Sequence, residues 1–263
     1  MLIIGEKING TLKSVGPAIV ARDSAFIQDL ARRQVEAGAD VLDVNAGTPP
    51  ETEPEDMRWL VRTVQAVVTV PLCIDSANPE ALAAGLQVHQ GKAIINSTSG
   101  EERRLENILP LAKEFDCAVV GLALDEGGIS ESVTGRLAAS EKIVSAAVKY
   151  GIPLERVYID PLVLSVSTNT KEALISLQTL RGVKERFPGV KTISGLSNVS
   201  FGLPNRALIN RAFLVLLMGV GLDAAILNPL DKELMATIKA TELLLNRDEY
   251  CMGYLKAYRE GKL

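Results

Sequence analysis

Residues 23–45 read DSAFIQDLARRQVEAGADVLDVN, and this stretch holds one complete helix-and-strand unit. Asp23 is a favourable N-cap, apolar residues then recur at helical spacing, and Gly38 is a typical helix end. The run Val41–Asn45 that follows is rich in β-branched residues and short, which indicates a buried strand. A strand that pairs in parallel with its neighbours needs such a crossover helix between them. The stretch therefore predicts an α/β fold with a parallel sheet.

The same unit recurs along the whole chain. Eight short apolar runs alternate with helical patterns and are the expected strands: Leu2–Glu6, Val41–Asn45, Leu72–Asp75, Ala93–Asn96, Ala118–Ala123, Val157–Asp160, Lys191–Ser194 and Ala224–Leu227. Several helix starts are marked between them, by Pro54 in a first turn, by Asn78-Pro79, and by Asp231. Asn169 with Glu172 resembles a capping box, and Pro110 interrupts one of the helical patterns.

Eight units in 263 residues occupy about 33 residues each, which is typical of a closed (β/α)8 TIM barrel. An open doubly wound sheet would be expected to carry a G-x-G-x-x-G turn after its first strand, and residues 5–10 lack one. Hydrophobic residues make up 47% of the chain and aromatic residues only 4%, as expected of strands buried on both faces. No composition break marks a boundary, so we expect residues 1–263 to form a single domain.

Composition and charge exclude several classes of function. The net charge is −4 with no basic block, which argues against nucleic-acid binding. No apolar run approaches the length of a membrane span and no signal segment is recognisable, so a cytoplasmic protein without a membrane partner is expected. One histidine, His89, and three scattered cysteines make a zinc site, a Ser-His-Asp triad or a disulfide framework improbable. His89 is expected at a solvated helix end, and the cysteines as core thiols.

Nearly every expected strand ends in a carboxylate or a carboxamide, and in a barrel these ends meet around the active site. The residues are Glu6 with Asn9, Asn45, Asp75, Asn96, Asp125 with Glu126, Asp160, Asn198 and Asn228. Each one alone is better explained as a turn or cap residue. Their coincidence at all eight strand ends favours a polar pocket.

The types of residue in this set point to a neutral ligand. The acids are dispersed rather than clustered, so no protein-bound catalytic metal is expected. Lys191 opens its strand instead of ending it, which disfavours Schiff-base chemistry. Amides that both donate and accept, together with carboxylates that accept N–H groups, suit a flat heterocycle with alternating donors and acceptors.

A resemblance to a known family enters at the seventh unit, ISGLSNVSFGLPNR, residues 193–206. This segment resembles the signature of the methyltetrahydrofolate-binding methyltransferases of the pterin-binding family. These include the methyltetrahydrofolate:corrinoid/iron–sulfur protein methyltransferase and the folate domain of cobalamin-dependent methionine synthase. Other segments agree in order and spacing: GEKIN (5–9), ADVLDVNAG (39–47), IDS (74–76), INS (95–97) and IDP (159–161).

The resemblance implies a reaction, its substrates and a partner. It implies transfer of the N5-methyl group of methyltetrahydrofolate, the methyl donor, to the cobalt of a corrinoid (cobalamin), of the reductive acetyl-CoA pathway type. The corrinoid is expected on a partner, the corrinoid/iron–sulfur protein, because His89 lacks the context of a cobalamin-binding motif. A homodimer is implied as well. The apolar segment Phe213–Met218 could form its interface or pack within its own barrel.

The resemblance also assigns roles to individual residues. Asn198 matches the residue that reaches N5, and we expect Asn198 and Asp160 to be catalytic. Asp75, Asn96 and Asp160 match the residues that hold the pterin ring, and Gly195 lets the ring approach the backbone. Further substrate contacts are expected from Ser197, Arg206 and Glu6, where the arginine could equally form a surface salt bridge and Glu6 could equally lie at the barrel bottom. Phe201 stands where some relatives carry a polar residue.

Two other functions stay open at this point. One is a dihydropteroate synthase-like pterin enzyme, although the eighth unit, Ile226–Leu230, lacks the basic residues and histidine of that pattern. The other is a folate-binding module without chemistry of its own.

Overall fold

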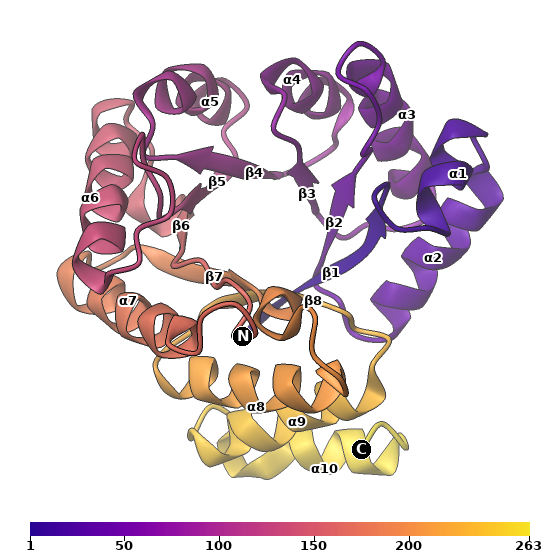
Figure 1. Ribbon diagram of the computed structural model, residues 1–263. Coiled ribbons are helices and arrows are strands. Elements are labelled where there is room, and N and C mark those ends of the chain that lie inside the picture. Colours follow the sequence, from indigo (N-terminus) through magenta and orange to yellow (C-terminus); the bar gives the residue numbers. More distant parts are fainter.

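The computed structural model describes all 263 residues as a closed barrel of eight parallel strands, each hydrogen-bonded to its sequence neighbours, with β1 closing against β8. Figure 1 shows the strands at the centre and the helices around them. The strands are β1 (Leu2–Asn9), β2 (Val41–Asn45), β3 (Leu72–Asp75), β4 (Ile94–Ser99), β5 (Ala118–Leu122), β6 (Val157–Asp160), β7 (Lys191–Gly195) and β8 (Ala224–Leu227). The predicted (β/α)8 TIM barrel and all eight strands are confirmed.

Ten α-helices and three short 3₁₀ segments cover the barrel. The helices are α1 (Val15–Val20), α2 (Ser24–Glu36), α3 (Glu53–Gln65), α4 (Pro79–Val88), α5 (Glu102–Glu114), α6 (Val133–Lys149), α7 (Glu172–Arg186), α8 (Arg206–Gly219), α9 (Lys232–Leu244) and α10 (Met252–Arg259). The 3₁₀ segments are Leu154–Arg156, Leu196–Ser200 and Glu249–Cys251. Helices α1 and α10 were not predicted. The expected interruption at Pro110 is wrong, because α5 continues through it.

Three of the predicted helix starts show the hydrogen bonds of N-caps. The side chains of Asp23, Asn78 and Asp231 each accept a bond from a backbone N–H two or three residues further on. The capping box at Asn169 and Glu172 is wrong: Glu172 is buried and pairs with Arg136 instead.

The barrel interior is filled by one residue from each strand at mid-height. This layer consists of Ile4, Val41, Cys73, Ile94, Val120, Tyr158, Ile193 and Ala224. Side chains alternate between the two faces of a strand, so residues two positions further along the chain also point inward, one layer closer to the carboxyl ends. That next layer holds polar side chains on β1 to β4 and on β6. Two larger apolar clusters, of 38 and 14 buried residues, join the outer face of the strands to the helices.

The isolated histidine and cysteines differ in part from expectation. His89 ends α4 as predicted, but it is half-buried, and its Nε2 accepts a hydrogen bond of 3.2 Å from the backbone N–H of Leu72. Cys73 and Cys117 are buried core thiols, whereas Cys251 is exposed.

Helix α8 has two apolar faces. Phe213, Leu214, Leu217 and Met218 are buried against the barrel, while Val215 and Leu216 are exposed. The segment therefore packs in part against its own barrel, and its role in a dimer interface stays a prediction. None of the helices combines the length and apolar character that crossing a membrane requires.

Candidate active site

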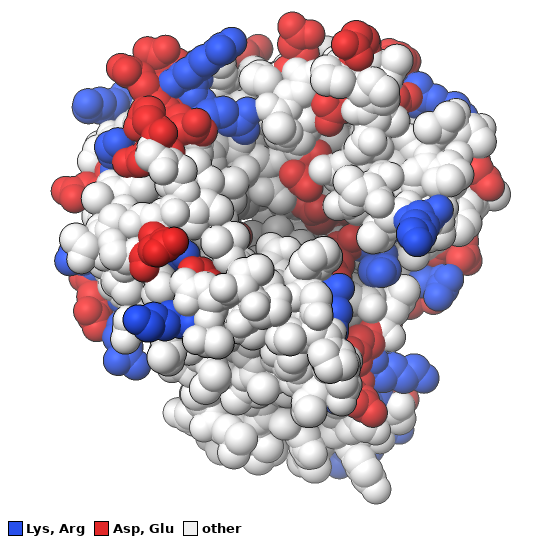
Figure 2. Space-filling model, viewed as in Figure 1, with Lys and Arg blue, Asp and Glu red and all other residues white.

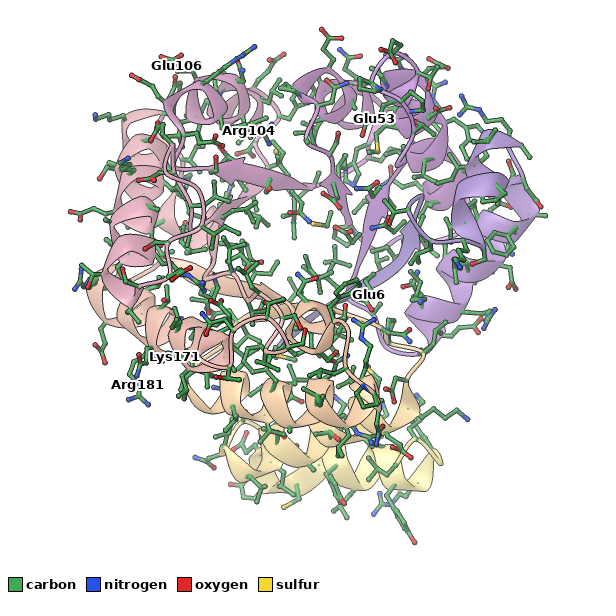
Figure 3. All side chains as sticks on the ribbon, in the orientation of Figure 1. Glu6, Glu53, Arg104, Glu106, Lys171 and Arg181 are labelled. Atoms are coloured by element: carbon green, nitrogen blue, oxygen red, sulfur yellow. The ribbon has the colours of Figure 1, made fainter.

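The carboxyl ends of the strands surround a hollow in the face of the molecule that Figure 2 presents, with acidic atoms along its wall. Figure 3 shows Glu6 beside this opening, and Lys171 and Arg181 on the outer side of α7. The inward-pointing side chains of the layer closest to the carboxyl ends of the strands converge here. The hollow is therefore the candidate active site.

Four side chains on β2, β3 and β4 form a connected polar floor on one side of the opening. The amide Nδ2 of Asn45 donates to Oδ2 of Asp75 at 2.8 Å, and the amide Nδ2 of Asn96 donates to Oδ1 of Asp43 at 3.1 Å. Asp75 and Asn96 are direct neighbours in the register of β3 and β4. The second oxygen of Asp75 and the side-chain Oδ1 of Asn96 are thereby left as acceptors for a ligand.

Burial controls the protonation of this floor. It raises the pKa of Asp43 well above its usual range, and the nearby charge of Asp75 raises it further. Burial also raises the pKa of Asp75, against the hydrogen bond from Asn45 that lowers it. Two carboxyl groups so close in a site of low dielectric do not both ionise readily.

A second group of polar atoms lies on the opposite side, at the ends of β6 and β7. Oδ1 of Asp160 accepts a hydrogen bond of 2.8 Å from the backbone N–H of Leu162, and the backbone of Gly195 is a further partner. A Cβ atom at Gly195 would lie 3.4 Å from Nδ2 of Asn198, so this amide stands directly over the glycine. Asn198 is exposed, whereas Asp160 is buried, and burial raises the pKa of Asp160 to about 6.

The third group joins β1 to the segment after β7. Ser197 donates from its hydroxyl to Oε2 of Glu6 at 2.9 Å, and burial raises the pKa of this carboxyl group. Glu6 therefore lies at the mouth and not at the barrel bottom. Arg206 donates to the carbonyl oxygen of Ser197 and to Oγ of Ser200, and its guanidinium lies 5.8 Å from the ring centre of Phe201. The arginine thus shapes the 197–201 turn instead of forming a salt bridge.

Four of the polar residues near strand ends make local contacts. Asn9 and Asn228 accept bonds from backbone N–H groups two residues further on, as turn residues do. Asp125 and Glu126 lie beyond the end of β5 and both contact Lys142 at the surface. The expectation that all eight strand ends contribute is therefore wrong for β5, and a contribution of Asn228 at the end of β8 stays a prediction.

Asn45 was expected at the pocket as a strand-end residue, although not as a substrate contact, whereas Asp43 was not predicted at all. Asp43 lies inside a strand between two apolar residues, so a search of strand ends passes over it. Its position two residues before Asn45 was the available signal, because residues two apart share a face.

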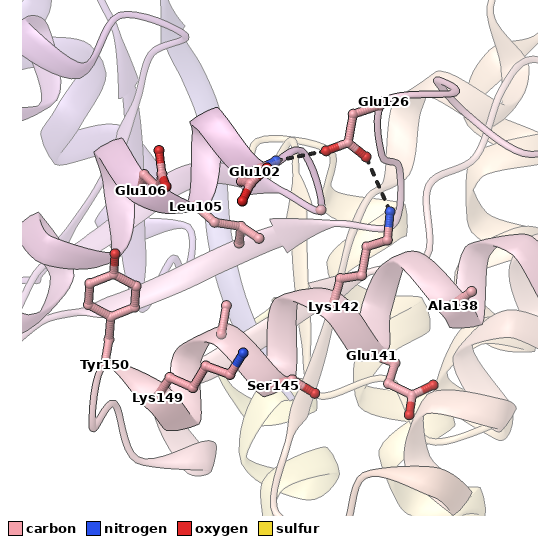
Figure 4. Close-up of a pocket in the computed structure, with 12 residues that line it drawn as sticks. Glu102, Leu105, Glu106, Glu126, Ala138, Glu141, Lys142, Ser145, Lys149 and Tyr150 are labelled. Carbon is pink, nitrogen blue, oxygen red and sulfur yellow. Dashed lines mark hydrogen bonds and ion pairs between the residues drawn. The ribbon is translucent and has the colours of Figure 1, made fainter.

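A cavity of about 610 Å³ lies outside the barrel between α5 and α6, separate from this pocket. Figure 4 shows Glu126 between the amide of Glu102 and the ammonium of Lys142. Glu126 is thus held by local partners, and none of the residues predicted to bind substrate lines the cavity.

Comparisons with known proteins agree with the geometry. The chain is 41% identical to the methylcorrinoid:tetrahydrofolate methyltransferase of Eubacterium limosum, over 100% of this chain and 98% of that protein. It is 32% identical to methionine synthase of Mycobacterium leprae (strain TN), over 87% of this chain but only 20% of that longer protein.

Solved structures show the same fold at low identity. Dihydropteroate synthase of Xanthomonas albilineans with 4-aminobenzoic acid superposes with a TM-score of 0.71 at 22% identity, covering 95% of this chain and 93% of that one. Residues 6–228, most of the chain and nearly the whole barrel, match the family described as pterin binding enzyme. With a relative at 41% identity along its full length, the predicted resemblance is confirmed, and the chain belongs to the pterin-binding enzyme family.

Proposed function

We propose that this enzyme transfers a methyl group between N5 of tetrahydrofolate and the cobalt of a corrinoid that a separate protein carries. The observation that carries the proposal is the 41% identity to the Eubacterium limosum enzyme, whose name contains both substrates, over the full length of both chains. The arrangement of polar groups at the barrel mouth supports it, with residues 1–263 acting as one domain.

The floor on β2 to β4 suits the pterin ring of the folate. The free oxygen of Asp75 and the side-chain Oδ1 of Asn96 accept bonds from its donor-rich edge, and Asp160 takes part from the opposite side. Leaving such groups without partners inside a buried pocket costs about 1–3 kcal/mol each, so these contacts determine affinity and orientation together. In this proposal Glu6, Ser197 and Arg206, which form the third group of polar residues, make further contacts with the folate.

Asn198 is the residue that we assign to N5. A tertiary amine leaves poorly unless it gains a proton or a strong hydrogen bond by the transition state, and such assistance is worth about 10²–10⁴-fold. An amide donates to N5 without being an acid itself. The carboxyl group of Asp160, with a pKa of about 6, exchanges protons near neutral pH, and we propose that it is linked to N5. Gly195, beside both Asp160 and Asn198, leaves room for the ring.

The corrinoid, whose cobalt accepts or donates the methyl group, must reach the opening from outside the barrel. The Eubacterium limosum enzyme is named in the direction from methylcorrinoid to tetrahydrofolate, whereas the sequence led us to expect the opposite direction. The same residues serve both directions by microscopic reversibility. Flow from methyltetrahydrofolate, an iron–sulfur corrinoid protein as partner, a place in the reductive acetyl-CoA pathway and a cytoplasmic location stay predictions.

A homodimer is part of the proposal. Several apolar side chains on α8, α9 and α10 are exposed, and Figure 2 shows few charged atoms over this part of the surface. They include Leu208, Val215, Leu216, Leu244 and Met252. Exposed apolar side chains gathered on neighbouring helices are typical of an interface between subunits.

The test is anaerobic mixing of the protein with methyltetrahydrofolate and reduced cobalamin, in which methylcobalamin formation is followed by absorbance. The reverse mixture, tetrahydrofolate with methylcobalamin, tests the other direction. Conversion in either direction supports the proposal. Folate binding without conversion, including with a corrinoid protein present, would indicate a binding module. Product formation from a pterin pyrophosphate and 4-aminobenzoate would instead indicate a synthase.

A further inference from the structure

Arg136 on α6 and Glu172 at the start of α7 form an ion pair from which water is excluded. Their side chains are 0% and 1% exposed, and the two charged groups are 2.8 Å apart. Other ion pairs of this protein have at least one partly exposed partner or involve a chain terminus. A fully buried pair is weak support for stability in general, because apolar side chains often replace one without loss. A contribution to stability therefore does not explain why this ion pair lies where it does.

The guanidinium of Arg136 connects the loops that follow β5 and β6. Its Nε donates to the carbonyl oxygen of Ser130 at 2.8 Å. One terminal nitrogen donates to the carbonyl oxygens of Pro161 and Leu162 at 3.2 and 2.8 Å, and the other holds Glu172. Four of its five N–H groups thus hold partners, and only the planar guanidinium supplies so many in a fixed arrangement.

The peptide that Arg136 holds is the one that orients Asp160. Leu162 has a φ of 60°, a left-handed conformation that leucine seldom adopts, so surrounding contacts must hold it. While its carbonyl oxygen accepts from Arg136, its N–H donates to Oδ1 of Asp160. Arg136 therefore acts on Asp160 through one residue of backbone, without touching the pocket.

Glu172 continues the arrangement toward β7. It accepts bonds from the backbone N–H of Leu164 and from the amide of Asn169, so both ends of the β6–α7 loop are fixed to one carboxylate. In the same loop, Val166 donates from its backbone to the carbonyl oxygen of Val199, beside Asn198. The loop thus joins the supports of the two residues to which we assign the chemistry.

We infer that Arg136 and Glu172 are positioning residues that hold the Pro161–Leu162 peptide so that Asp160 presents its carboxyl group correctly to the folate. The inference rests on the proposed function and adds two residues to its site. Arg136 also has an electrostatic effect, since its positive charge lowers the pKa of Asp160 against the larger effect of burial. No other charged side chain contributes to that shift.

Two variants test this without leaving a buried charge unpaired. Arg136→Lys keeps the charge, but one ammonium cannot reach Ser130, both loop carbonyls and Glu172 together. The double variant Arg136→Met/Glu172→Leu removes both charges and fills the space with apolar groups. The matched control is Lys184→Met, which breaks an ion pair with Asp223 made by the same helix α7, near the start of β8 at the other end of the barrel.

Three measurements on the purified proteins are compared: methyltetrahydrofolate binding by calorimetry, the methyl-transfer rate at saturating folate, and the titration of Asp160 by carboxyl ¹³C NMR, with Asp160→Asn to identify the resonance. We expect both Arg136 variants to lose about tenfold in transfer rate. The midpoint of Asp160 should rise in the double variant, where the charge is gone. It should stay near that of the wild type in Arg136→Lys. The control should change none of the three.

A purely structural role would show as variants that lose thermal stability while binding, rate and the Asp160 midpoint stay as in Lys184→Met, and this would overturn the inference. Failure of the proposed function is distinguishable, because the wild-type protein would then neither bind folate nor transfer methyl. In that case the NMR titration still decides whether Arg136 controls Asp160. If the double variant does not fold, Arg136→Lys alone decides through its rate.

Discussion

The β2–β4 side and the β6–β7 side of the pocket hold their polar groups in different ways. On the first side, side chains bond to side chains on the next strand, as Asn45 does to Asp75 and Asn96 to Asp43. On the second side, Asp160 is held by the backbone of Leu162 in the loop after β6 and of Gly195 at the end of β7, and Asn198 lies exposed above that glycine. Strands fix a group more rigidly than loops do. The first side thus suits binding and the second suits chemistry.

The largest effect that separates the two sides is expected from Asn198→Ala. Removing a donor that acts only as charge develops at N5 should slow methyl transfer about 100-fold. The folate dissociation constant should change little, because the floor still holds the ring. Stopped-flow absorbance of methylcobalamin and calorimetry of folate binding measure the two quantities.

The control for this change is Asn107→Ala, the same substitution at an exposed position of the outer helix α5. It should leave the rate near that of the wild type. A loss of folate affinity in Asn198→Ala as large as the loss of rate would remove the division between a binding side and a chemical side.

On the binding side, Asp75→Asn should give the reverse pattern. The substitution removes a charged acceptor that the ligand contacts, which weakens folate binding about tenfold to 100-fold. Transfer at saturating folate should fall far less. Calorimetry checks this against Asp40→Asn, a change at the amino-terminal end of β2, where Asp40 accepts a bond from the backbone of Ile3. Equal affinities in the two variants would contradict the assignment of the floor.

Because Asp160 is buried, its carboxyl group should make the stability of the protein depend on pH. Burial raises its pKa from 3.8 to about 6 in the folded protein, so the folded state binds the proton more tightly than the unfolded chain does. Its contribution to stability is full below pH 3.8 and is lost as the pH rises through 6. A shift of about two pH units corresponds to on the order of 3 kcal/mol.

Asp160→Asn keeps an acceptor for Leu162 but carries no charge to bury. The free energy of unfolding should therefore be higher than that of the wild type at pH 7.5, with the two proteins alike near pH 4. Urea titrations at both pH values measure this difference. A variant less stable than the wild type at pH 7.5 would show that the charge of Asp160 is compensated in the folded protein.

Much of this comparison could be read from the sequence. The alternation of strands and helices gave all eight strands, and the motif at residues 193–206 led to Asn198 and Gly195. The ends of the expected strands pointed to Asp75, Asn96 and Asp160, because parallel strands bring their carboxyl ends together. The roles of these residues stay predictions until the variants are measured.

What the sequence did not give depends on contacts between distant residues. Asp43 was missed because it lies within an apolar strand. Asp125 and Glu126 were wrongly placed at the pocket because β5 ends at Leu122, three residues earlier. The pairing of Arg136 with Glu172, 36 residues apart, has no local pattern at all.

The smallest effect concerns the support of the binding side at the opposite end of β3. The Nε2 of His89 accepts a bond from Leu72, the first residue of the strand that ends in Asp75. Burial lowers the pKa of His89 below 6.5, so its contribution to stability is present above pH 6.5 and is lost as the pH falls through the folded value. Because His89 is only half-buried, we expect the free energy of unfolding to change by less than about 1 kcal/mol from this cause between pH 7.5 and pH 5.

His89→Gln retains an acceptor that does not titrate, so urea titrations should show a smaller loss of stability on acidification than in the wild type. The same loss in both proteins would mean that this end of β3 does not depend on the histidine, and that the rigidity of the binding side comes from the bonds between Asn45, Asp75, Asn96 and Asp43 alone.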